Sequence, residues 1–178
     1  MDDYTLVKEC VKGNPKAQRM LFDKFSSKMM TVCLRYTKDT SEAEDALQDG
    51  FIKIFNKLPE FKMEGSLEGW IRRIMVNTSL DALRKAKRFQ TDANLEEVDY
   101  KVSTFELASD QLQAADLLKI INEMPDGYKV VFNLFAIEGY GHKEIGELLG
   151  ISENTSKSQY SRARAFLKTQ LEKFEIER

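Results

Sequence analysis

The stretch that decides the fold runs from His142 to Leu167 and consists of HKEIGELLGISENTSKSQYSRARAFL. It predicts a short helix over 142–149, a turn at Gly150-Ile151-Ser152 and a longer second helix. Two helices joined by a tight turn that contains glycine form a helix-turn-helix, whose second helix can enter the DNA major groove. The alternative is an αα-hairpin with no role in DNA binding.

The side chains of this stretch favour the helix-turn-helix. Gly146 permits close approach of the helices, Gly150 can adopt the turn conformation that other residues avoid, and Ser152 can cap the second helix. The inward arc of that helix consists of Ser156, Tyr160, Ala163 and Leu167. Its outward residues can bind bases or phosphates: Asn154, Thr155, Ser158, Ser161 and Arg162, with Lys157 and Arg164 on one flank and Gln159 on the other.

Charge is distributed unevenly along the chain. The 27 Lys and Arg residues against 29 Asp and Glu residues give a net charge of −2, which argues against a general nucleic-acid coat. Residues 71–90 are basic, whereas 39–51 and 91–116 are acidic. Opposed patches of this kind suit a protein that contacts DNA in some places and a protein partner in others.

Several features predict a cytoplasmic protein. No segment approaches the roughly 18 consecutive apolar residues of a membrane span, and the N-terminus MDDYTLVKEC lacks a signal-peptide pattern. Cys10 and Cys33 lie in apolar helical patterns, so we expect them to be buried free thiols.

Apolar residues recur at helical spacing, and the chain has only three prolines and nine glycines, so we expect an all-α fold. The pattern predicts two small helical domains, 1–88 and 111–178, joined by a flexible acidic linker over 89–110. In the N-terminal domain we expect a short first helix that ends at Gly13, and a second that runs to about Tyr36, with Asn14 as its cap and Pro15 at its first position. A third helix is expected to begin at the capping box of Ser41 and Glu44 and to end before Pro59. The fourth is expected over 67–88, with Ser66 as its cap. In the C-terminal domain the expected helices cover 111–124, 128–138, 142–149 and 153–173.

The fourth helix has an apolar arc and a basic edge. Arg73, Asn77, Arg84 and Arg88 line one flank, beside the short loop 61–66. Such an edge suits a single-stranded nucleic acid with flipped bases, and a solvated helix face is the alternative. The apolar arc consists of Leu67, Trp70, Ile71, Ile74, Met75, Thr78 and Ala82.

The third helix is acidic in its first turns. Asp45, Gln48 and Asp49 fall on nearby faces and form a surface suited to a basic helical partner. Acids at this position also favour the helix dipole, so a solvated capping turn is an alternative. Metal or acid–base chemistry is a poor third, because a di-iron bundle needs Glu-x-x-His pairs and the chain has a single histidine, His142. We therefore expect no metal ligands, cofactor or catalytic residues.

Three stretches, in the same order along the chain, resemble the extracytoplasmic-function sigma factors, which are two-domain members of the sigma-70 family of bacterial RNA polymerase initiation factors. Residues 42–51 resemble the region 2.2 helix, residues 61–84 resemble regions 2.3–2.4, and residues 142–167 resemble region 4.2. The resemblance implies a specificity subunit of RNA polymerase that directs promoter-specific transcription initiation.

Carried over by position, the resemblance implies three sites and several partners. The implied partners are core RNA polymerase (the β′ coiled coil and the β subunit), promoter DNA and an anti-sigma factor. The implied polymerase-binding residues are Asp45, Gln48 and Phe51. The implied −10 residues are Lys62, Glu64 and Ser66 in a base-capturing loop and Arg73, Asn77 and Arg84 on the next helix, and the implied −35 residues are Thr155, Lys157, Ser158, Ser161 and Arg162.

The recognition helix departs from the commoner family pattern Thr-Val-Lys-Ser-Arg at two positions. Ser156 places a hydroxyl where an apolar residue usually packs, so we expect a looser contact or a hydroxyl bonded back to its own helix. Gln159 removes one positive charge that the pattern would place beside the DNA.

Two other classes of protein remain as alternatives. A stand-alone helix-turn-helix regulator would bind duplex sites tightly without polymerase. A small helical enzyme is disfavoured, since the chain shows no Gly-rich phosphate loop and no nucleophile–base pairing. His142 is expected to cap or flank its helix near the DNA backbone.

Overall fold

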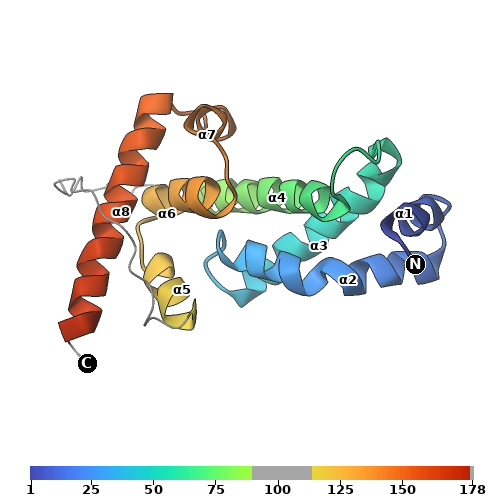
Figure 1. The fold of residues 1–178 in the computed structure, drawn as a ribbon, viewed down its shortest axis with the longest axis horizontal. Helices are drawn as coiled ribbons and strands as arrows, with labels where there is room; N and C mark the ends of the chain where they lie inside the picture. The colour runs from blue at the N-terminus through green and yellow to red at the C-terminus, as the bar shows by residue number, and fades with distance from the viewer. Residues whose placement is uncertain (90–113, 177–178) are drawn as a thin grey trace. The chain divides into compact units, whose positions relative to one another are not determined.

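The structure, a computed structural model, describes residues 1–89 and 114–176. The chain divides into two compact units, Met1–Asn94 and Leu95–Arg178. Every regular element in the described ranges is helical, which confirms the all-α prediction (Figure 1). The predicted linker over 89–110 lies, apart from Phe89, outside the described residues.

The N-terminal unit is a helical bundle in which α3 packs against both α2 and α4. Its core is built from aliphatic and thioether side chains that are almost fully buried, such as Leu21, Met29, Ile54 and Met75. A Cβ atom at Gly50 would overlap the Met75 side chain, so the glycine permits the close contact of α3 with α4. The elements are α1 (Asp3–Val11), α2 (Pro15–Leu34), α3 (Thr40–Lys57), the short 3-10 helix η1 (Leu58–Glu60) and α4 (Leu67–Phe89).

Local capping signals explain where two of these helices begin. As predicted, the Asn14 side chain caps α2 and Pro15 occupies its first position. The predicted capping box at Ser41 was wrong: α3 is capped by Asp39, whose carboxylate accepts the N–H of Glu42 at 2.9 Å. The Glu42 carboxylate in turn accepts the N–H of Lys38 at 3.0 Å. Asp39 is the cap in place of Ser41 because its short carboxylate already satisfies the free N–H of Glu42 in the first turn.

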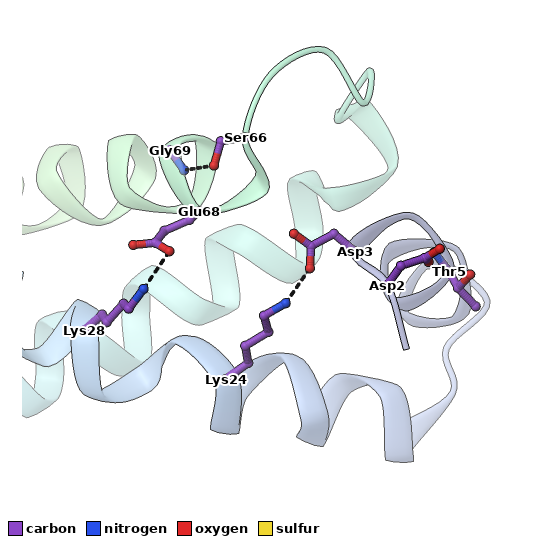
Figure 2. A network of polar contacts seen from close by, with 8 residues as sticks. All are labelled: Asp2, Asp3, Thr5, Lys24, Lys28, Ser66, Glu68 and Gly69. Carbon is purple, nitrogen blue, oxygen red and sulfur yellow. Dashed lines mark hydrogen bonds and ion pairs between the residues drawn. The ribbon is translucent and has the colours of Figure 1, made fainter.

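Two ion pairs connect α2 to neighbouring helices of the N-terminal unit (Figure 2). Lys24 of α2 contacts Asp3 of α1 at 2.6 Å, and Lys28 of α2 contacts Glu68 of α4 at 2.8 Å. All four side chains are partly exposed, so each pair contributes at most about 1 kcal/mol. Their main effect is on position: the Lys28–Glu68 pair, for example, holds the first turn of α4 against α2.

The C-terminal unit is a second helical cluster with its own core. A short segment of this unit departs from the prediction of one α-helix over 128–138. Its first half is α6, whereas η2 is a π-helix that ends before Gly139, a residue with φ of 78°. The core includes Ile120, Ile121, Met124, Phe132 and Leu167. The elements are α5 (Ala114–Asn122), α6 (Asp126–Phe132), η2 (Asn133–Ile137), α7 (His142–Leu149) and α8 (Glu153–Ile176).

Two further expectations concern the environment of the chain. Cys10 and Cys33 are both free and buried, as predicted, and burial raises the pKa of each thiol above its usual value. Among the helices in the described residues, none is long and apolar enough to cross a membrane.

Candidate nucleic-acid interfaces

The helix-turn-helix forms as the sequence predicts. Gly150 ends α7 with a left-handed φ of 68°, and the Ser152 hydroxyl caps α8 by accepting the N–H of Thr155 at 3.0 Å. A Cβ at Gly146 would lie 2.7 Å from the carbonyl oxygen of Ile151, which confirms the close approach expected there. The predicted inward residues Ser156, Ala163 and Leu167 are buried. The two helices are therefore locked in one geometry.

Ser156 neither makes a loose contact nor bonds back to its own helix, the two outcomes that were expected. Its hydroxyl is fully buried and lies 2.9 Å from Nδ1 of His142, so the bond joins α8 to the first residue of α7. The imidazole stacks on Phe135, with ring centroids 4.2 Å apart. Burial lowers the pKa of His142 below its usual value, and the positive charge of Lys157 lowers it further, against the opposite effect of Glu153. The contact is polar and specific rather than loose.

Three of the predicted −35 residues already have polar partners in or directly before the first turns of α8. The Thr155 hydroxyl shares a hydrogen bond of 2.8 Å with the Ser152 hydroxyl. The Ser158 hydroxyl donates to the carbonyl oxygen of Asn154 at 2.7 Å. Lys157 forms an exposed ion pair of 2.7 Å with Glu153, one turn earlier. Each of these side chains would have to exchange or share a partner on binding DNA.

Ser161 and Arg162 are half-buried on the outward side of α8, and within the described chain no hydrogen bond or ion pair occupies their side chains. Gln159, expected to remove one positive charge beside the DNA, also has a packing role within its own unit. Its Oε1 atom is buried, and a Cβ at Gly127 would lie 3.6 Å from it, so the amide packs over the start of α6. The Gln159 amide therefore contributes to the packing of α8 on α6.

Three of the four residues of the predicted edge of α4 lie on the surface, and the side chain of the fourth, Arg88, lies outside the described part of the chain. Arg73, Asn77 and Arg84 are exposed, and Leu67, Ile71 and Met75 of the apolar arc are buried. Val76, Ser79 and Leu80 are buried as well, so α4 is enclosed over a wider arc than the sequence suggested. The Arg84 guanidinium contacts Asp81 at 3.0 Å.

The loop before α4 is short and tightly shaped. Lys62, Glu64 and Ser66 are exposed, and the Ser66 hydroxyl also accepts the N–H of Gly69 at 3.3 Å as a helix cap (Figure 2). Met63 has a left-handed φ of 59°, a backbone conformation that residues other than glycine, asparagine and aspartate rarely adopt. Strained backbone of this kind is concentrated at binding sites and switches.

The exposed side of α3 carries Asp45, Gln48 and Asp49, as predicted. Phe51 does not belong to that side: its side chain is 3% exposed, and its ring lies 4.7 Å from that of Phe22. A direct partner contact by Phe51 is therefore not supported. The adjacent Ile52 is 59% exposed and lies one turn beyond Gln48 and Asp49. The residues Ala43, Ala46, Gly50 and Ile54 could have revealed this, because their helical spacing places Phe51 on the buried side.

A cavity of about 230 Å³ opens between α3 and α4, next to Asp45. Its lining includes the carboxylates of Glu42, Asp45, Asp49 and Asp81 and the ammonium groups of Lys53 and Lys85. Lys53 contacts Asp81 at 3.3 Å across the two helices. Among the described residues, no group of three or more His, Cys, Asp or Glu side chains is arranged to hold a metal ion.

Comparison with known proteins gives consistent matches over both units. The Sigma-70 region 2 family model matches residues 21–89, and the Sigma-70, region 4 model matches residues 114–167. The ECF RNA polymerase sigma factor SigW of Bacillus subtilis (strain 168) is 28% identical over 176 residues, which is 93% of this chain and 94% of that protein. The RNA polymerase sigma factor SigZ of the same organism is 32% identical over 153 residues, 85% of each chain.

A solved structure agrees at the level of the fold. The sigma factor RpoE in complex with the anti-sigma factor NepR from Bartonella quintana has a TM-score of 0.56 at 22% identity, over 86% of this chain and 96% of that one.

The fold and these surfaces define a two-domain, all-helical DNA-binding transcription factor. The chain belongs to the sigma-70 family of RNA polymerase sigma factors, in its extracytoplasmic-function branch. Its function is promoter-specific transcription initiation, in which sigma factors act as non-catalytic initiation factors.

Proposed function

We propose that the chain is a specificity subunit that holds core RNA polymerase and two promoter elements through three separate surfaces. The observation that carries this proposal is the helix-turn-helix, in which Ser156, Ala163 and Leu167 on the inward side of α8 are buried and the outward side is polar. A helix with this division can enter a major groove without disturbing its own domain. The chain itself performs no catalysis and works in the cytoplasm, where polymerase and promoters meet.

The polymerase surface consists of Asp45, Gln48 and Ile52 on α3, with the acidic cavity beside them. The exposed carboxylates and the cavity suit a basic helix, as in the β′ coiled coil of core polymerase, and the β subunit is a further expected contact. Exposed Ile52 supplies the apolar anchor, while buried Phe51 supports the surface from below. A central apolar residue surrounded by polar groups is the usual composition of a protein interface.

The −10 surface consists of the loop residues Lys62, Glu64 and Ser66 and of Arg73, Asn77 and Arg84 on α4. The exposed loop stands beside a basic helix edge, an arrangement that can hold the phosphates of one strand while a flipped base is captured. The strained Met63 supports a loop whose shape is fixed before binding, which lowers the entropic cost of recognition.

The −35 surface consists of Thr155, Lys157, Ser158, Ser161 and Arg162. Arg162 is the strongest candidate for base recognition, since arginine pairs with guanine through two hydrogen bonds and its guanidinium has no partner in the described residues. Lys157 exchanges Glu153 for a phosphate.

An anti-sigma factor is proposed as a further partner. The solved structure of RpoE contains the anti-sigma factor NepR, and a protein that covers the α3 and α8 surfaces of this chain would keep it from both polymerase and DNA.

Run-off transcription tests the proposed function. Core polymerase with this protein should produce promoter-specific transcripts from a library of promoter sequences, and core polymerase alone should not. The proposal fails if a core preparation that is active with another sigma factor yields no specific transcript with this chain.

A further inference from the structure

We propose that Asn154, the second residue of α8, recognises an adenine in the −35 element and is a specificity-determining residue of this sigma factor. The inference rests on the proposed function, in which α8 lies in the major groove. It adds a base-reading residue that lies outside the −35 set given above.

The position of Asn154 favours base contact. Its side chain is exposed, and at about 100° per residue it shares the outward side of α8 with Ser158 and Ser161. This side is opposite the buried Ser156, Ala163 and Leu167. In a helix-turn-helix the first residues of the second helix contact base edges, so Asn154 heads the row that enters deepest.

The neighbours of Asn154 are chemically occupied, whereas its amide is not. Glu153 is paired with Lys157, the Thr155 hydroxyl is bonded to Ser152, and the Ser158 hydroxyl donates to the Asn154 carbonyl oxygen. For the Asn154 side chain itself, the described residues provide no hydrogen-bond partner. In the first two turns of α8 it is thus the exposed polar side chain that can bind a base without first losing a contact within the described residues.

The chemistry of the amide selects the base. An asparagine side chain offers one donor and one acceptor in a plane, which match N7 and the N6 amino group of adenine in the major groove.

The experiment is run-off transcription by the holoenzyme on a library randomised across the −35 element, with Asn154→Ala compared with the unmodified chain. We expect preference for adenine at one position to fall by about 5- to 150-fold, while preferences elsewhere persist. The matched control is Asn122→Ala, which removes an exposed amide from α5 and should leave all preferences unchanged. Alanine is favourable in helices, so both variants should fold, and thermal unfolding would check this.

Three results would overturn the inference: unchanged preferences in Asn154→Ala, an equal loss on every sequence, or a lost preference for a base other than adenine. An equal loss would indicate a phosphate contact instead. Failure of the proposed function is distinguishable, because then the unmodified chain itself would give no promoter-specific transcript.

Discussion

At the scale of single residues, the most consequential contact is the hydrogen bond between His142 and Ser156. It joins the first residue of α7 to a buried position of α8, in place of an apolar contact. A buried hydroxyl without a partner costs about 1–3 kcal/mol, so each residue depends on the other. The neighbouring Phe135 holds the imidazole in the plane that this bond requires.

This contact predicts a pH dependence of stability. Burial and Lys157 lower the pKa of His142 in the folded protein, whereas the unfolded chain takes up the proton near pH 6.5. Stability is therefore fully present above about pH 6.5 and declines as the pH falls through the folded pKa. Urea unfolding between about pH 7.5 and 5.5 should show this decline.

The control for that measurement is His142→Phe, which keeps a ring against Phe135 but removes the titration. Its overall stability will differ because Ser156 loses its partner, so the comparison is between slopes with pH. Equal slopes in the two proteins would show that His142 does not carry the effect.

Adjacent residues on α3 give a second prediction at this scale. Ile52→Ala should weaken binding to core polymerase yet change the free energy of unfolding by less than about 0.5 kcal/mol, because Ile52 is 59% exposed. Phe51→Ala should instead cost about 3–5 kcal/mol of stability, since its ring is buried. Fluorescence anisotropy with labelled protein and urea unfolding would measure the two effects. Unchanged polymerase affinity in Ile52→Ala would remove that residue from the docking surface.

At the scale of elements, helical periodicity predicted the helices well because burial on one side and caps at the ends act locally. The limits of α7 and the cap of α2 follow directly from such signals. The cap of α3 did not, because Asp39 and Ser41 are both competent caps. The π-helix η2 did not either, because the apolar spacing over 128–138 is the same for an α-helix. Phe51 lies on the buried side of α3, which the helical spacing of Ala43, Ala46, Gly50 and Ile54 indicates and the family resemblance does not.

The crossing of α7 and α8 gives a prediction about the whole helix-turn-helix. Gly146→Ala should destabilise the C-terminal unit by about 1–3 kcal/mol, although alanine favours helices, because its Cβ would lie 2.7 Å from a backbone oxygen that cannot move aside. The matched control is Gly127→Ala in α6, where the nearest atom is a side-chain oxygen at 3.6 Å. Thermal unfolding of both variants provides the comparison. Similar melting temperatures for Gly146→Ala and Gly127→Ala would mean that α7 and α8 can move apart without loss of stability.

At the scale of the whole molecule, each unit has its own core, and the proposed DNA-binding residues are confined to two patches. The total charge is −2, so attraction to DNA is local and weak. We expect the free chain to bind promoter duplexes poorly and to bind them far better as part of the holoenzyme. Fluorescence anisotropy with one labelled promoter, with and without core polymerase, measures this difference. Tight, specific binding by the free chain would favour a stand-alone regulator.

The burial of both cysteines has a consequence for how this factor receives signals. Peroxides and disulfides react with exposed thiolates, whereas Cys10 and Cys33 are enclosed in helical cores with raised pKa values. The two thiols of the folded chain are therefore protected from oxidants. A thiol-based response to oxidative stress would therefore have to begin in another molecule and reach this chain as the gain or loss of a binding partner.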